Sequence, residues 1–176
     1  MINNDILTAI YNNDIEKFKS LSNSIKKTEF KTVLYLCCEH NYYKILSFLL
    51  EKEEINSESF NICLDIAASN GSFKSVKYLL NHNKKHYKFI LNDNKALQVC
   101  VREKFVDIVN LILEDNQIDP TLYNNSAIKI AIEIDNKKII KMLWKKHNVK
   151  KYFKEHDKEL YNEICKSNAQ DKVKQF

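Results

Sequence analysis

Three short groups of side chains have the residue types from which a metal site or an acid–base pair could be built. Cys37 and His40 are one helical turn apart, so both could face one metal ion. His82 and His86 have the i, i+4 spacing of a histidine pair on a helix. Glu155–Asp157 places a histidine between two acids, a combination that general acid–base catalysis uses. Whether any group is a site depends on the segment around it.

The surroundings of all three groups favour structural roles. Cys37 fills a position that recurs along the chain as a small, inward-facing residue. His82 and His86 lie in a lysine-containing segment between repeats, where the ammonium charges repel a cation. Neighbouring side chains in Glu155–Asp157 point in different directions, and the single glycine leaves no glycine-rich phosphate loop. We therefore expect no catalytic residue, no metal site and no cofactor, and we expect the chain not to be an enzyme.

The recurring position belongs to a pattern with a period of about thirty residues. Relative to an anchor residue, each copy has a turn residue at +4 and apolar residues at −3, +9 and +12. Successive anchors are 28 to 33 residues apart: Ala9, Cys37, Ala67, Cys100, Ala131 and, in a truncated copy, Ile164. A period in this range predicts stacked supersecondary units rather than one globular core.

Each slot of the pattern has a physical reason. Two short helices are expected per copy, one centred on the anchor and one from about +6 to +13. The small anchor lets neighbouring helices approach closely, and the +9 and +12 residues form an apolar stripe at helical spacing. The +4 residue must reverse the chain in the left-handed region, which suits the Gly, Asn and Asp found in five copies. Lys104 is the exception, and we expect mild strain or a different turn there.

Composition agrees with a helical protein that has an apolar core. Hydrophobic residues make up 44% and charged residues 29%, and one glycine and one proline disfavour a β-sandwich or barrel. No apolar run approaches the ~20 residues that span a bilayer, and residues 1–5 lack the features of a signal peptide. The odd count of five cysteines indicates reduced thiols. These features predict a cytoplasmic protein that does not associate with membranes.

The net charge of +5 raises a second function class, a basic helical repeat protein that binds nucleic acid. Lysines cluster at Lys84–Lys85, Lys137–Lys138 and Lys145–Lys151, and such clusters can contact phosphates. However, Arg102 is the only arginine among 28 basic residues, whereas readers of bases and phosphates favour arginine. Abundant lysine, asparagine and isoleucine are also typical of AT-rich coding sequences. An acidic protein partner is the better explanation of the charge, and nucleic acid remains the alternative.

The pattern resembles the ankyrin repeat, a helix–turn–helix unit followed by a projecting loop or finger. Segments 63–80, 96–113 and 127–143 carry the resemblance most strongly, and segment 117–127 resembles the divergent copies in AT-rich genomes of large amoebal viruses and intracellular parasites. The Thr-Pro-Leu-His opening of the family is absent, although Thr32 and Ser126 keep a capping hydroxyl at its first position. The Gly-Ala-Asp finger phrase is missing too, so plain loops are expected. Longer helical repeats or an ordinary bundle fit the spacing less well.

The resemblance implies an all-α solenoid of about four internal repeats between N- and C-terminal capping units. It forms a single domain over 1–176, with units at about 1–27, 28–57, 58–90, 91–121, 122–154 and a partial unit at 155–176. In the last unit we expect a turn at Asn168 and a short second helix over 170–176.

The resemblance also implies a monomeric protein–protein interaction module that binds through its concave face and loops, as an adaptor or as an inhibitor of a host protein. Partner contacts are expected at the −2, +2 and +3 slots of each first helix and at loop tips. Of these, Phe30, Phe60 and Tyr123 are the best single candidates, because aromatic anchors dominate interface energies. The full candidate set is Phe30, Tyr35, Glu39, His40, Phe60, Asp65, Ser69, Asn70, Gln98, Arg102, Glu103, Tyr123, Lys129 and Glu133.

Overall fold

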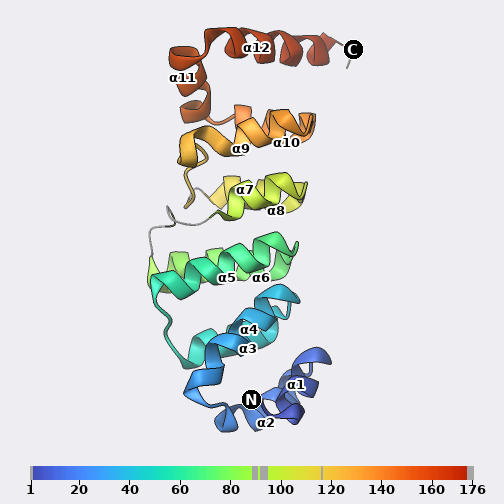
Figure 1. Ribbon diagram of the computed structural model, residues 1–176, viewed down its shortest axis with the longest axis vertical. Coiled ribbons are helices and arrows are strands. Elements are labelled where there is room, and N and C mark those ends of the chain that lie inside the picture. Colours follow the sequence, from blue (N-terminus) through green and yellow to red (C-terminus); the bar gives the residue numbers. More distant parts are fainter. Residues whose placement is uncertain (1, 89–90, 92–94, 116, 174–176) are drawn as a thin grey trace.

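The computed structural model of the chain describes residues 2–88, 91, 95–115 and 117–173, with side chains as far as residue 166. Within these residues the chain forms α-helices and two short helical turns, and no strand. Figure 1 shows the helices as a stack of pairs along one long axis, from blue at the N-terminal end to red at the C-terminal end. The predicted all-α solenoid is therefore confirmed.

Each pair consists of two helices joined by a tight turn. The helices are α1 (Asn4–Tyr11), α2 (Ile15–Leu21), α3 (Lys27–Glu39), α4 (Tyr43–Lys52), α5 (Ser57–Ser69), α6 (Phe73–His82), α7 (Ala96–Arg102), α8 (Val106–Asp115), α9 (Leu122–Glu133), α10 (Lys137–Trp144), α11 (His147–His156) and α12 (Lys158–Val173). Two short helical turns follow particular helices: a 3-10 turn, η1 (Ser22–Ser24), follows α2, and a π-helical turn, η2 (Asn83–Tyr87), follows α6.

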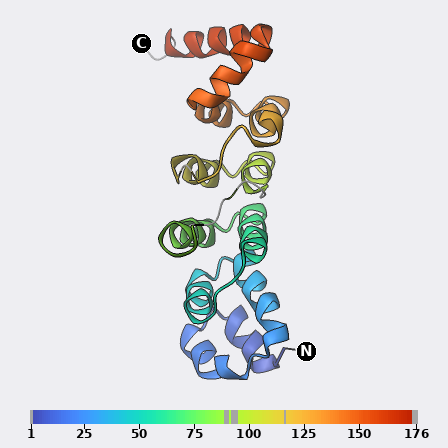
Figure 2. The ribbon, with the colours of Figure 1, turned by 90° about the vertical axis from the view of Figure 1, so that its left-hand side faces the viewer.

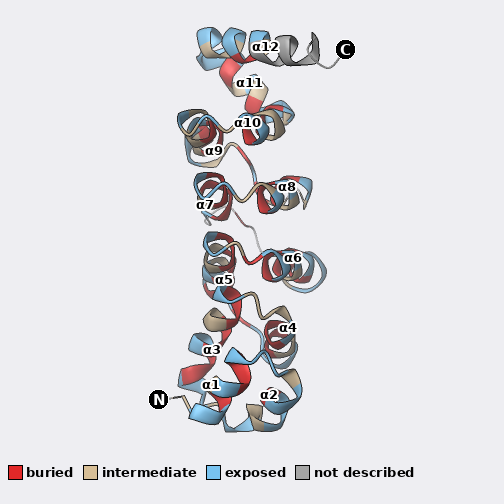
Figure 3. Ribbon diagram, turned by 90° about the vertical axis from the view of Figure 1, so that its right-hand side faces the viewer, coloured by how far each residue is buried: buried red, intermediate tan, exposed pale blue. Residues whose placement is uncertain are grey.

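The pairs stack so that like helices contact like helices. The first helices α3, α5, α7 and α9 contact one another in succession, and the second helices α4, α6, α8 and α10 do the same. Figure 3 shows these two columns side by side, with buried residues in red where the columns face each other. In Figure 2, the opposite view, loops cross from the second helix of one pair to the first helix of the next. The core is thus one continuous layer between the columns.

A left-handed residue ends the first helix in each of the first five pairs. The +4 residues have φ of 51° at Asn13, 61° at Asn41, 68° at Gly71, 61° at Lys104 and 49° at Asp135. One residue later, the backbone N–H donates to the carbonyl of the anchor, at 2.8 to 2.9 Å in all five turns. The prediction of a left-handed turn is confirmed. The lysine-containing turn is not a different one: it is the same turn with a strained residue.

The anchor residues of the first five repeats are fully buried. Burial raises the pKa of the Cys100 thiol to about 12, and it raises the pKa of Cys37 as well. Both thiols therefore stay neutral at neutral pH and act as small apolar residues. The five buried anchors are Ala9, Cys37, Ala67, Cys100 and Ala131.

The C-terminal pair departs from the prediction. The expected turn at Asn168 and the start of a separate helix at residue 170 are wrong, because α12 continues without a break to Val173. The rest of the expected helix, 174–176, lies outside the described residues. The polar segment after Ile164 lacks the apolar stripe that would hold a second helix against the stack. α11 fills the first position of this pair and lies along the long axis of the stack, while α12 crosses it (Figure 1).

We expect Lys104→Gly to stabilise the fold by about 0.5–1 kcal/mol, because glycine adopts the left-handed conformation without strain. This net gain already allows for the larger conformational entropy that glycine gives the unfolded chain.

Gly71→Ala should destabilise the fold by about 1–2 kcal/mol. There an added Cβ would be strained at φ +68° and would lie 3.0 Å from the Phe105 ring. Urea unfolding followed by circular dichroism measures both changes, and a Lys104→Gly protein less stable than wild type would contradict the strain argument.

Candidate functional site

The exposed ends of the first helices form a continuous row beside the tight turns. This row occupies the +2 and +3 slots, and stacking of α3, α5, α7 and α9 brings its members into adjacent repeats. Carboxylates, a guanidinium, an imidazole and small polar groups alternate along it. The predicted exposure of these slots is confirmed, whereas their role in binding stays a prediction. We call the seven residues the turn row: Glu39, His40, Ser69, Asn70, Arg102, Glu103 and Glu133.

The −2 slot is less accessible than expected. Gln98 is only 8% exposed, so its assignment to an exposed surface is wrong. Tyr35 is half-buried, and burial raises the pKa of its hydroxyl. Lys129 is exposed, and its ammonium group lies 5.8 Å from the centre of the Tyr152 ring of α11. The −2 slot lies close to the seam between first helices, where packing of the next repeat decides how much of each side chain is covered.

Two of the three aromatic candidates are not loop tips. Phe30 is 8% exposed and Phe60 is fully buried, and both lie inside first helices. The helices begin earlier than the family opening suggested: the Asn56 side chain accepts the N–H of Ser59 at 2.9 Å and starts α5 there. The Asn-Ser-Glu-Ser run before Phe60 was the sequence signal for this start. Tyr123 does lie at an exposed turn, with φ of 52° and 45% of its surface accessible.

The two candidate metal-ligand pairs differ in how their side chains are arranged. Cys37 is buried and His40 is exposed, so the two side chains lie in different environments. No group of three or more His, Cys, Asp or Glu residues in the described part of the chain is placed to hold a metal ion. The second pair does come together, with the ring centroids of His82 and His86 4.5 Å apart. His82 also stacks on Tyr78 at 5.3 Å, and its Nδ1 is 3.1 Å from the Tyr78 hydroxyl.

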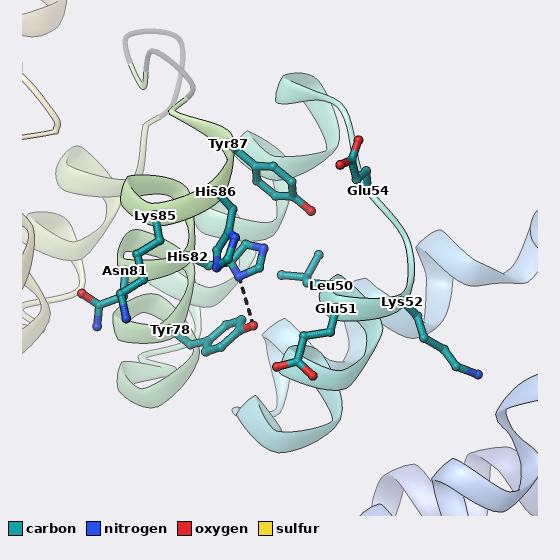
Figure 4. Close-up of a pocket in the computed structure, with 10 residues that line it drawn as sticks. All are labelled: Leu50, Glu51, Lys52, Glu54, Tyr78, Asn81, His82, Lys85, His86 and Tyr87. Atoms are coloured by element: carbon teal, nitrogen blue, oxygen red, sulfur yellow. Dashed lines mark hydrogen bonds between the residues drawn. The ribbon is translucent and has the colours of Figure 1, made fainter.

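These aromatic rings border a pocket of about 790 Å³ between the end of α4 and the α6–η2 segment. Figure 4 shows the histidines side by side, with Tyr87 nearby and Glu51 on the facing helix. The pKa of His82 is lowered mainly by burial and, to a smaller extent, by the charge of His86. The negative charge of Glu51 acts in the opposite direction and raises it. Sequence patterns did not indicate this pocket, because residues 50–54 and 78–87 become neighbours only through stacking of two repeats.

A sequence model of three ankyrin repeats matches residues 6–90 and, again, residues 64–155. The chain belongs to the ankyrin repeat family. No curated protein matches it. The two matches overlap in the central repeats and together reach from α1 into α11, so that the ankyrin assignment covers the turn row and both helix columns. Of the helices described, none has both the length and the apolar character needed to cross a bilayer.

In this ankyrin stack, polar side chains connect each repeat to the next. Asn41 Oδ1 accepts the backbone N–H of Ser75 at 3.0 Å, in the first turn of α6. Asp65 Oδ1 accepts the N–H of Lys95, the residue before α7, at 2.9 Å. Both bonds satisfy a helix N-terminus from the preceding repeat. Asp65 therefore has a structural role in addition to the partner contact that its −2 slot suggested, and that contact stays a prediction.

We expect Asp65→Ala to lower the stability of the ankyrin domain by about 1 kcal/mol, because it removes a cap of α7. Asp65→Asn keeps the acceptor and should be at least as stable as wild type at neutral pH. Burial raises the pKa of Asp65 above its usual value of 3.8, so the folded chain holds this proton more tightly than the unfolded chain does. The free energy of unfolding contributed by Asp65 should therefore decrease as the pH rises above about 3.8. Urea unfolding at neutral and acidic pH tests this, and Asn and Ala variants of equal stability would refute the capping role.

The pocket histidine should make stability depend on pH. Because the pKa of His82 is lower in the folded chain than its usual 6.5, the unfolded chain binds more protons below pH 6.5. Stability should therefore fall as pH drops from 7.5 to 5, and His82→Phe should flatten part of that fall. Melting temperatures across this range are the measurement, with His147→Phe on the exposed start of α11 as the matched control. Parallel pH profiles of wild type and His82→Phe would contradict the assignment.

Proposed function

We propose that this ankyrin repeat protein is a non-catalytic interaction module that binds a partner protein through the turn row and the exposed residues Lys129 and Tyr123. One contrast supports this. The anchor slot is buried in five repeats, while the +2 and +3 slots, apart from the half-buried Ile134, are exposed and differ chemically from one repeat to the next. Uniform buried slots maintain the scaffold, and variable exposed slots give each repeat its own contacts.

The charge of the turn row supports a protein partner over a nucleic acid. Glu39, Glu103 and Glu133 contribute three carboxylates to the row, against the one guanidinium of Arg102. A phosphate backbone would be repelled by such a row, because nucleic-acid affinity depends on neutralising phosphates with cations. A protein surface that presents lysine or arginine opposite α7 and α9 suits it better.

We further propose that the chain works as one monomeric domain in the cytoplasm, as an adaptor or as an inhibitor of a host protein. The five free thiols suit a reducing compartment. The resemblance of segment 117–127 to repeats from viral and parasite genomes supports a host protein as the target. In either role, binding is stoichiometric and needs no cofactor.

Capture from a eukaryotic cell lysate tests the function. We expect at least one protein to be retained by wild type and lost with Glu103→Lys/Glu133→Lys, because both reversals lie in adjacent repeats of the turn row. The retained protein, produced separately, should then bind wild type in a one-to-one complex by calorimetry. Binding should weaken roughly tenfold or more in the double variant, as expected when contacts at an interface become repulsive.

The control is Glu53→Lys/Glu163→Lys, which makes the same change of charge at exposed sites outside the turn row. It should retain the partner. If both double variants lose every captured protein equally, or if the one-to-one complex survives the turn-row reversal unchanged, the proposed surface is wrong. Helix content and melting temperature of both variants should match wild type.

A further inference from the structure

The net charge of the chain is concentrated in one short stretch. Residues 145–158 contain six lysines against Glu155 and Asp157, a formal charge of +4 within a total of +5. Residues 1–144 carry only +1, and residues 159–176 are neutral. A coding bias that enriches lysine along the whole chain does not concentrate charge in this way. The stretch therefore needs an explanation of its own.

Helix geometry separates the residues of this stretch into two faces. Val149 and Phe153 of α11 are buried, and the Phe153 ring packs against Trp144 of α10 with centroids 5.9 Å apart. Lys151 and Lys154 are exposed and lie away from that contact. The buried face attaches α11 to the stack, so the lysine face is held in a fixed position toward solvent.

A groove of about 600 Å³ lies between the lysine face of α11 and the first turns of α12. Figure 1 shows α12 leaving the end of α11 at a steep angle at the end of the stack. Among the described residues, no carboxylate forms a salt bridge with any of the four lysines in this groove. We call it the basic groove. Glu155 is the one acidic residue in its lining, and the other lining residues are His147, Lys150, Lys151, Lys154, Lys158 and Tyr161.

We propose that the basic groove binds an acidic segment of a partner protein, whose Asp and Glu carboxylates pair with the lysine ammonium groups. The lysine face from His147 to Lys154 covers ~10 Å of helix, which matches about three or four residues of an extended segment. Lys158 continues it onto α12. Flexible lysines are compact point charges, so the groove selects a high density of carboxylates rather than one fixed geometry.

Nucleic acid fits the basic groove less well. The only arginine, Arg102, lies at the end of α7, so the groove has no guanidinium fork for a phosphate. Single strands also need aromatic rings on which bases can stack. Apart from the imidazole of His147, the groove has one aromatic ring, Tyr161, which already packs against Trp144 with centroids 5.6 Å apart.

A membrane surface fits less well too. Peripheral helices that bind bilayers combine basic residues with large exposed apolar side chains that enter the lipid. The large exposed apolar residues among the described side chains are Tyr11, Ile62, Phe73 and Tyr123, and none of them is on α11 or α12. The basic groove also lies outside the turn row, so this inference does not depend on the proposed function.

Fluorescence anisotropy with a labelled peptide of alternating Glu and Ser residues tests the inference. Wild type should bind it at low ionic strength and release it as salt rises, while the matching Gln–Ser peptide should bind at least about tenfold more weakly. Lys151→Glu/Lys154→Glu/Lys158→Glu should weaken binding of the acidic peptide roughly tenfold or more. All three lysines are exposed, so melting should be unchanged.

The matched control is Lys17→Glu/Lys31→Glu/Lys44→Glu, which changes the net charge equally at exposed sites near the N-terminus. It should keep most of the binding, which would place the effect in the groove. Equal loss in both triple variants, or no binding of the acidic peptide by wild type, would overturn the proposal. So would tighter binding of an oligouridine RNA of equal charge, or of phosphatidylserine-containing vesicles, in the same assay.

Discussion

The hydrogen bond that closes each tight turn is the constraint on which this stack depends. The carbonyl of the anchor residue accepts the N–H of the residue at +5, and the residue at +4 must be left-handed for this bond to form. The bond reverses the chain within a few residues, so the second helix of each pair returns alongside the first. Because the same bond recurs in five repeats, the pairs have the same shape and can stack in two columns.

The same constraint explains why potentially reactive residues are inert here. An anchor at the end of a turn-forming helix lies between neighbouring repeats, where only a small side chain fits, and Cys37 and Cys100 meet that need. Their burial keeps the thiols protonated and away from solvent. Polar side chains that do face the next repeat, such as Asp65, cap its helices. Side-chain chemistry inside the stack is therefore used for assembly.

A scaffold held in this way leaves chemical variety to its surfaces, and the charges separate between two of them. The turn row carries three glutamates on the first helices, whereas the basic groove holds most of the net positive charge at the last pair. The two surfaces differ in origin as well. The turn row repeats two slots of the ankyrin unit, while the basic groove lies where α12 meets α11 and the repeat pattern ends. A partner that engages both would need basic and acidic regions.

Local spacing in the sequence determined the all-α fold, the buried anchors and the left-handed turns, because each follows from residues within one helix–turn–helix unit. It also correctly indicated the exposed turn row. Only the tertiary structure decided that Phe60 and Gln98 are covered, that Asp65 bonds to Lys95, and that α12 continues through Asn168. These outcomes depend on the neighbouring repeat, or on its absence at the end of the stack. Contacts across some thirty residues leave no mark in the spacing of a single repeat.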